Sequence, residues 1–394
     1  MNQFEASEIW DQLRHEPELI RQAGSLSDDP LKRQKILRQQ YSDSLVRLAC
    51  ELADLRSKAH EKFEQADQLW LTRQSYEQAS TLELAAYKAE RFARLNPAPD
   101  QILDFCTGAG IDAIALSRIA PVISFDLDPL LSKLAAWNAE SFPDHHPIQF
   151  EQQDVTQVPF AGKVIHFDPD QRDQSGRRHR RLELISPPLE FLQQVSAQAR
   201  AAAIKLSPAS NFGGKFPEAE AELISWRGEC KQAVIWSGEF AEPGLWRATV
   251  LPANATLAGD PLEAWPEFSG VEQYVYDPDP AITRAGLINL LAAQESVSRL
   301  DDAEEYLTSA EPVSSPFMTR FRVLEVFGRN ETPLKQYLRT REIGVLEIKC
   351  RHLKIDVVRK RKSLLVPGEN AATLIFARVS GKTAILVCER EAEG

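Results

Sequence analysis

The chain has 394 residues, enough for two or three domains of about 150 residues each. Its 46 Lys and Arg stand against 57 Asp and Glu, and this net charge of −11 excludes a protein that coats nucleic acid with its whole surface. The composition, with 43% hydrophobic and 26% charged residues, excludes wholesale disorder.

The apolar runs fall well short of the roughly 18 residues that a membrane span needs, so we expect no membrane association. The first residues lack a basic segment followed by an apolar stretch, and we therefore expect a cytoplasmic protein. The five cysteines, at positions 50, 106, 230, 350 and 388, form no CxxC pair and no disulfide framework. We expect reduced thiols and no metal site.

Residues 1–95 are predicted to form an N-terminal helical region. Apolar residues spaced by three or four mark one helix face from Leu37 to Leu55. A second face carries Tyr76, Ala79, Leu82, Ala86, Ala89 and Phe92. The prolines of the segment 96–99 end this helix, because proline cannot continue one.

Residues 96–252 alternate short apolar runs with helical patterns, which predicts a doubly wound parallel sheet with its ligand at the strands' carboxyl ends. The expected strands are 101–106, 122–125, 148–151, 163–167, 201–206, 231–236 and 245–250. The expected helices are 110–119, 130–140 and 189–200.

Residues 253–330 form a connecting region with weaker patterns, in which we expect helices around 282–293 and 301–308. A small α/β domain is predicted over 331–394, with helices at 334–339 and 355–361 and a strand at 344–348. The strands 373–379 and 382–388 are expected to pair as a hairpin around Ser380-Gly381.

The most informative segment follows the first expected strand and opens a helix. Gly108 and Gly110 permit a tight turn and close approach of the backbone to a ligand. The helix N-terminus behind them offers free N–H groups that suit a carboxylate or a phosphate. With Ala113 in third place the segment also satisfies G-x-G-x-x-[GA], so a dinucleotide site is an alternative at this point.

Four carboxylates, Asp104, Asp126, Asp154 and Asp168, are expected at the ends of successive strands around one crevice. A carboxylate at Asp126 can accept hydrogen bonds from both ribose hydroxyls of a nucleoside, and one at Asp154 can accept from an adenine amine. The alternative for each is a helix cap or a turn carboxylate, which is less plausible for all four together.

This pattern, Asp104-x-x-x-Gly108-x-Gly110 followed by Asp126, Asp154 and Asp168-Pro169, resembles the class I S-adenosylmethionine-dependent methyltransferases. The resemblance implies a Rossmann-like sheet and S-adenosyl-L-methionine as cofactor. It places Asp104 and the glycine loop, including Cys106, beside the methionine moiety. It also places Asp126 on the ribose, Leu127 against the adenine, and Asp154 with Val155 at the adenine edge. We interpret Cys106 as a small packed thiol rather than a nucleophile.

A longer resemblance is to the bacterial methyltransferases with a C-terminal THUMP-like domain. It is carried by Thr72-Arg73, by the segment 77–80 and by Arg172 with the segment 176–178. Further matches are at 277–280, 284–287, 315–317 and 344–349. The segment 168–171, Asp-Pro-Asp-Gln, departs from the Asn-Pro-Pro-Tyr and Asp-Pro-Pro-Tyr of enzymes that methylate amino groups of nucleic acids.

On the substrate side, Asp168 is the candidate catalytic residue, which either positions the nucleophile and accepts a proton or only shapes the pocket. Pro169, the loop arginines Arg172, Arg177 and Arg178, and Lys205 at the end of the next strand are the candidate substrate-binding residues. Arginine forks suit phosphate groups.

The segment 335–362 holds ten Lys and Arg against three acidic residues, a local charge of +7. This segment fits a basic face that tracks an RNA backbone, and a solubilising face is the alternative. We therefore expect a methyltransferase acting on structured RNA, such as tRNA or rRNA. A small-molecule methyltransferase and a non-catalytic RNA-binding protein that retains the cofactor pocket stay open, and a nicotinamide enzyme ranks behind them.

Overall fold

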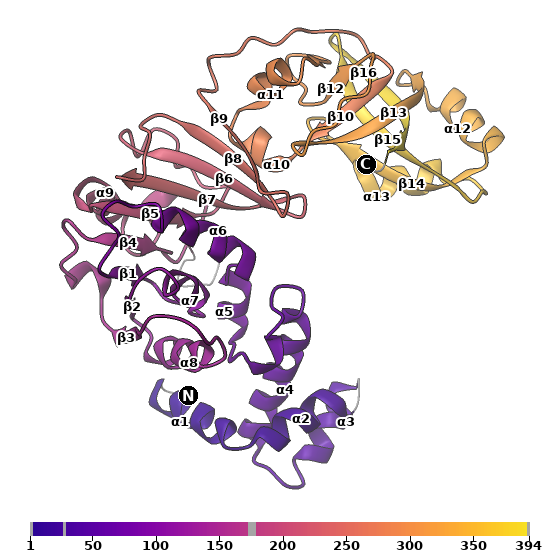
Figure 1. Cartoon of the computed structure of the whole chain (residues 1–394). Helices are drawn as coiled ribbons and strands as arrows, with labels where there is room; N and C mark the ends of the chain where they lie inside the picture. The colour runs from indigo at the N-terminus through magenta and orange to yellow at the C-terminus, as the bar shows by residue number, and fades with distance from the viewer. Residues whose placement is uncertain (1–2, 27–28, 172–178, 392–394) are drawn as a thin grey trace. The chain divides into compact units, whose positions relative to one another are not determined.

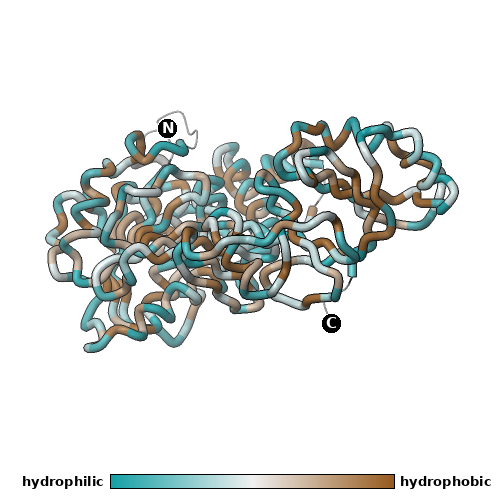
Figure 2. The backbone as a smooth tube through the Cα atoms, turned by 90° about the horizontal axis from the view of Figure 1, so that it is seen from above, coloured by the Kyte–Doolittle hydropathy of each residue, from teal (hydrophilic) through white to brown (hydrophobic). Residues whose placement is uncertain are grey.

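A computed structural model describes residues 3–26, 29–171 and 179–391 (Figure 1). Its internal contacts divide the chain into two compact units. The first unit comprises Met1–Ala219 and Val234–Pro243, and the second comprises Glu220–Ala233 and Gly244–Gly394. In each unit the segments made of hydrophobic residues gather in the interior (Figure 2).

The first unit begins with helices, as expected. They are α1 (Gln3–Arg14), α2 (Pro17–Ser25), α3 (Pro30–Leu37), α4 (Asp43–Ala59), η1 (Ala66–Gln68), α5 (Arg73–Gln78) and α6 (Leu82–Phe92). The apolar face expected from 37 to 55 is divided between α3 and α4. A new helix begins after Ser42, a residue type that favours the N-cap position.

The buried face of α6 differs from the expected one. Ala86 is exposed, and the helix buries Leu84, Ala85, Ala89, Phe92 and the lysine Lys88. Lysine side chains usually face solvent, so the apolar pattern did not include Lys88 in the buried face. The expected face of α6 was therefore displaced by one or two positions from the observed one.

The sheet of the first unit has the expected parallel core. Its strands β1 (Ile102–Phe105), β2 (Val122–Asp126), β3 (Ile148–Gln152), β4 (Val164–Phe167) and β5 (Ala201–Leu206) lie in the order β3-β2-β1-β4-β5. Adjacent pairs are all parallel. The second half of β7 (Glu229–Gly238), from Val234, also belongs to this unit.

The crossover helices of this sheet are α7 (Ile111–Leu116), α8 (Pro129–Ala139) and α9 (Leu189–Gln198), with short turns η2 (Val155–Gln157) and η3 (Leu182–Leu184). The chain moves one way from β1 to β3 and the other way from β1 to β4 and β5. Right-handed crossovers therefore place α7 and α8 on one face and α9 on the other. The strand order reverses between β1 and β4, and such switch points are where ligands bind in doubly wound sheets.

The second unit contains β6 (Glu220–Trp226), β8 (Trp246–Leu251) and β9 (Ala255–Gly259), and then a second sheet. The second sheet has the order β11-β12-β10-β13-β16-β15-β14. Its strands are β10 (Tyr274–Pro278), β11 (Ser298–Arg299), β12 (Leu307–Ser309), β13 (Met318–Phe327), β14 (Ile343–Cys350), β15 (Asn370–Val379) and β16 (Lys382–Arg390). Its helices are α10 (Pro280–Arg284), α11 (Ile288–Gln294), α12 (Glu331–Thr340) and α13 (Val357–Leu364).

Helices α12 and α13 share one core with the second sheet, through Leu334, Leu338 and Leu364. The opposite face packs against Leu300 and Tyr306 from the segment before β12. The expected hairpin around Ser380-Gly381 is confirmed, because Val379 pairs with Lys382.

Two expectations for residues 282–308 are wrong. The helix expected over 282–293 is two helices, since Gly286 adopts a positive φ of 73° between them. The segment 301–308 is a turn leading into β12 rather than a helix. Its Asp301 side chain accepts hydrogen bonds from the backbone N–H groups of Ala303 and Gly381, which stabilises the turn.

Within the described ranges, none of the helices combines the length and the apolar character needed to cross a membrane. Over the same residues, no three His, Cys, Asp or Glu side chains gather in a group that could hold a metal ion.

Candidate active site

The glycine loop connects β1 to α7 at the carboxyl edge of the first sheet. Gly108 and Gly110 have positive φ values of 56° and 80°, and Cys106 shares this backbone region with a φ of 64°. A Cβ atom on Gly110 would lie 2.9 Å from the Cβ of Ala135 in α8, so glycine is needed there for close packing. A Cβ on Gly108 would meet nothing within 4 Å, so this side of the loop is open to a ligand.

Asp126 lies at the end of β2 and is joined to the glycine loop. Its two carboxylate oxygens accept hydrogen bonds from the backbone N–H groups of Gly108 and Asp128, each at 3.0 Å. Each oxygen keeps a further lone pair for another donor. Burial raises the pKa of Asp126, and the two N–H donors oppose that shift. The next side chain, Leu127, is 71% exposed, which leaves an apolar surface beside the carboxylate.

Asp154 follows β3 and is exposed, whereas Val155 is buried. One Asp154 oxygen accepts hydrogen bonds from the backbone N–H and the hydroxyl of Thr156, so the residue caps the short turn η2. Its neighbour Gln153 donates its N–H to the carbonyl of Asp126 at 3.1 Å, which brings the ends of β2 and β3 together. Asp154 thus has a capping role as well as an accessible carboxylate.

Asp104, in β1, is 1% exposed and both its oxygens are engaged. One accepts the hydroxyl of Ser124 at 2.6 Å, and the other lies 2.7 Å from Nδ1 of His166. The Ser124 hydroxyl also lies 2.6 Å from that of Thr107 in the glycine loop. Asp104 is therefore connected to the glycine loop by hydrogen bonds through Ser124 to Thr107.

The contacts of Asp104 continue through the interior to the substrate side. Nε2 of His166 lies 3.2 Å from Nζ of Lys88, which forms an ion pair with Asp112 at 2.7 Å. Lys205 lies 3.8 Å from Asp112 and donates to Asp168 at 2.6 Å. We call this chain of contacts the buried network. Its members are Thr107, Ser124, Asp104, His166, Lys88, Asp112, Lys205 and Asp168.

The charged groups of the buried network shift one another's pKa values. Burial lowers the pKa of Lys88. For Lys205, burial is outweighed by the carboxylates of Asp168 and Asp112, and its pKa is raised. For Asp112, burial is outweighed by the positive charges around it, first that of Lys88, which hold its pKa well below the usual range. Burial raises the pKa of Asp168, and the charge of Lys205 opposes this.

Asp168 is where the buried network reaches the surface. Its side chain is 27% exposed, while those of Lys88, Asp104 and His166 are 1–2% exposed. Its backbone N–H bonds to the carbonyl of Phe105, which fixes it beside the glycine loop. Pro169 is buried directly after it. Lys205 also donates to the backbone carbonyl of Gln78, which comes from α5.

The thiol of Cys106 is not an activated nucleophile. Burial raises its pKa well above the usual range, and the carboxylates of Asp126, Asp168 and Asp104 add to the shift. A thiol held in its neutral form is a poor nucleophile. Cys106 is half-buried in the loop.

The loop arginines Arg172, Arg177 and Arg178 lie outside the described residues. In the other direction, the sequence prediction missed Lys88, Asp112, Ser124 and the bridging role of His166. Lys88 could have been recognised as a lysine within a helix face that is otherwise apolar, between Ala85 and Phe92.

A basic surface lies on the second unit, over α12, α13 and the loop that precedes α13. Of the ten basic residues between 335 and 362, Lys360 pairs with Glu331, and Lys349 and Arg351 pair with Asp277. Six others have exposed side chains: Arg339, Arg341, Lys354, Arg359, Arg361 and Lys362. These six define the basic surface.

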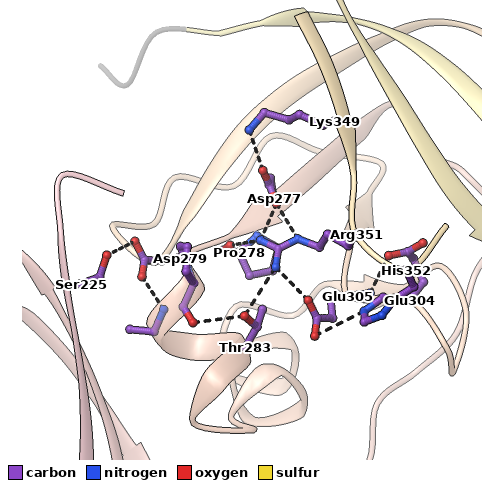
Figure 3. A network of polar contacts seen from close by, with 12 residues as sticks. Ser225, Asp277, Pro278, Asp279, Thr283, Glu304, Glu305, Lys349, Arg351 and His352 are labelled. Carbon is purple, nitrogen blue, oxygen red and sulfur yellow. Dashed lines mark hydrogen bonds and ion pairs between the residues drawn. The ribbon is translucent and has the colours of Figure 1, made fainter. Parts of the chain in front are cut away.

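Lys349 and Arg351 are held in a separate network (Figure 3). Arg351 donates to Asp277 at 2.9 and 2.6 Å and to Glu305 at 2.8 Å, while Lys349 reaches the other oxygen of Asp277 at 2.8 Å. These contacts connect β14 to β10 and to the segment before β12. The two residues therefore serve the fold of the second unit rather than its surface.

The comparisons with known proteins agree with this architecture. Residues 318–390 match the THUMP domain-like family. An uncharacterized S-adenosylmethionine-dependent methyltransferase from Mycobacterium tuberculosis strain H37Rv is 28% identical over 319 residues, which cover 79% of this chain and 85% of that protein. The counterpart in strain CDC 1551 has the same identity and coverage.

A crystal structure of a candidate methyltransferase from Porphyromonas gingivalis W83 is also similar. It is 17% identical, with a TM-score of 0.77, and the match covers 96% of this chain and 99% of that one. The Rossmann-like methyltransferase fold with a C-terminal THUMP-like domain, expected from the sequence, is confirmed.

Proposed function

We propose that this chain, a class I S-adenosylmethionine-dependent methyltransferase with a C-terminal THUMP-like domain, transfers a methyl group to structured RNA. The observation that carries the RNA assignment is the basic surface, which lies within the residues that match the THUMP-like family. In a chain of net charge −11, six exposed cations gathered on two helices and one loop provide a local site for a phosphate backbone.

The residues at the carboxyl edge of the first sheet fit the cofactor. The open side of Gly108 leaves room for close approach, and the free lone pairs of Asp126 suit ribose hydroxyls. The exposed Leu127 offers an apolar surface for the adenine, with Asp154 and Val155 at its edge. Bound there, S-adenosylmethionine supplies an electrophilic methyl group on a sulfonium.

The chain's own contribution to methyl transfer is alignment and control of one proton. Asp168 accepts a hydrogen bond from the N–H or O–H group that attacks the methyl carbon, and buried Pro169 limits the space beside it. Lys205, which donates to Asp168, positions that carboxylate. Arg172, Arg177 and Arg178 follow Asp168 in the sequence and would contact substrate phosphates. The five free cysteines are compatible with a reducing cytoplasm.

The direct test combines the full-length chain with isotope-labelled S-adenosylmethionine and total RNA from a strain lacking the gene, followed by mass spectrometry of the nucleosides. We expect label in one modified nucleoside, and none with Asp168→Ala. Label only in small molecules would instead establish a small-molecule methyltransferase. RNA binding without any label would establish a non-catalytic RNA-binding protein.

The basic surface has its own test with matched variants. Arg361→Glu with Lys362→Glu reverses two charges on α13, so the slope of log affinity against log salt for RNA should fall by about two. Affinity for S-adenosylhomocysteine should not change. The control, Arg378→Glu with Lys382→Glu, reverses two exposed charges near the β15–β16 turn. Equal effects of both pairs would remove the basic surface from the proposal.

A further inference from the structure

The buried network of the first unit is unusual in its charge. Its three carboxylates are Asp104, Asp112 and Asp168, and its two lysines are Lys88 and Lys205. All five except Asp168 are at most 9% exposed. Charges removed from water in this way are costly unless they are balanced.

The hydrogen bonds of His166 fix its contribution. A lysine ammonium has only donors, so Nζ of Lys88, 3.2 Å from Nε2 of His166, must donate to that nitrogen. The ring proton then lies on Nδ1 and is donated to Asp104 at 2.7 Å. His166 therefore passes a hydrogen bond along the network without adding a positive charge.

Among the residues that the structure describes, the three carboxylates of the buried network thus face two positive charges. One negative charge is in excess. Asp126 and Asp170, which with Asp168 and Asp104 raise the pKa of the neighbouring Cys106 thiol, are carboxylates and add no positive charge. The excess negative charge lies between the glycine loop and Asp168. The cofactor would approach the glycine loop, and the substrate would approach Asp168.

We propose that the excess negative charge of the buried network is matched to the sulfonium of the methyl donor, and that Asp168 takes up the proton that methyl transfer releases. This rests on the proposed function. In the reaction the bond between sulfur and the methyl carbon breaks, and its electron pair returns to sulfur. A bond forms between that carbon and the attacking nitrogen or oxygen, whose proton passes to Asp168.

With this proton transfer, the network and the ligand's sulfur together carry no net charge either before or after methyl transfer. Before transfer, one negative charge of the network faces one sulfonium. After transfer, the neutral thioether faces a network that has gained one proton. The same balance applies to the two ligands without any substrate. The complex with S-adenosylhomocysteine should therefore hold one more proton than the complex with S-adenosylmethionine.

The experiment is calorimetric titration of the full-length chain with each ligand, in buffers of different ionisation enthalpy, from mildly acidic to neutral pH. S-adenosylhomocysteine should take up about one proton more than S-adenosylmethionine. Because rising pH disfavours the more protonated complex, the preference for S-adenosylmethionine should increase by up to about tenfold per pH unit. No activity measurement is needed.

Two variants locate the proton. Asp168→Asn removes the excess charge and should abolish the difference between the two ligands. The control Glu239→Gln neutralises a surface carboxylate of the same unit that pairs with Arg200, and should retain the difference. A difference that persists in Asp168→Asn would overturn the assignment to Asp168.

The outcomes separate this inference from the proposed function. If both ligands bind to the unmodified chain with equal proton uptake at every pH, the charge match is wrong and the methyltransferase assignment stands. If neither ligand binds, both fail together. The comparison of the two ligands on the unmodified chain needs no variant, so an unfolded Asp168→Asn protein would not remove the test.

Discussion

At the scale of single residues, position rather than residue type decides what each carboxylate does. Asp104 and Asp126 lie in neighbouring strands, yet Asp104 is enclosed by Ser124 and His166, while Asp126 keeps acceptor capacity toward the open edge. The sequence predicted that these acids follow successive strands. It could not predict which would be enclosed, because that depends on side chains far away in the sequence.

Asp126 gives the first residue-scale prediction. Asp126→Ala removes the acceptors for two ribose hydroxyls, so binding of S-adenosylhomocysteine should weaken by about 2 kcal/mol. Calorimetry measures this loss, and a thermal melt checks the fold because Asp126 also accepts two backbone N–H groups. The half-buried Glu151, in β3, provides the control variant Glu151→Gln. An unchanged affinity in Asp126→Ala would mean that the ribose binds elsewhere.

The two glycines of the loop should respond differently to alanine. Gly110→Ala places a Cβ 2.9 Å from that of Ala135 and strains a backbone at φ 80°, so we expect a loss of more than about 1 kcal/mol of unfolding free energy. Gly108→Ala adds only the backbone strain and should cost less stability. Urea denaturation compares the two. Equal losses would show that packing against α8 is unimportant.

At the scale of elements, strands β1, β4 and β5 were predictable because they are buried on both faces and are mostly apolar. Each run is interrupted by one residue of the buried network: Asp104, His166 or Lys205. Strand β6 was missed because Glu220 and Glu222 look like surface residues. Both are fully buried, and they bond to Arg247 and Thr249 of β8. A local sequence pattern cannot reveal partners that lie this far away along the chain.

Helix α6 carries the element-scale prediction. Lys88→Met leaves Asp112 without its 2.7 Å partner in the interior, so the unfolding free energy should fall by about 3 kcal/mol at neutral pH. Since the folded-state pKa of Asp112 lies below its ordinary value, its contribution is present above that value and is lost as pH falls. The difference between the variant and the native chain should therefore shrink in acid.

Urea denaturation at several pH values measures this difference. Lys163→Met, at an exposed lysine of the same unit, is the control and should change stability little. A Lys88→Met loss that is constant from neutral to acidic pH would show that the ammonium does not act through Asp112.

At the scale of the whole molecule, the order of apolar and helical patterns along the sequence predicted the type of each region. Helices come first, then alternating strands and helices, and then a small α/β domain. The methyltransferase fold and the THUMP-like domain followed from motifs at strand ends and from scattered matches along the chain. The connecting region was poorly predicted. Its strands β10 to β13 pair with segments up to 69 residues away, and local pattern does not encode such pairing.

The most direct measurement is a crystal structure of the full-length chain grown with S-adenosylhomocysteine. We expect the adenosine to lie across the carboxyl ends of β1, β2 and β3, with both ribose hydroxyls on Asp126, the adenine against Leu127 and the sulfur facing Asp168. Density for the ligand at any other place, or a glycine loop closed by its own side chains with no ligand bound, would contradict it.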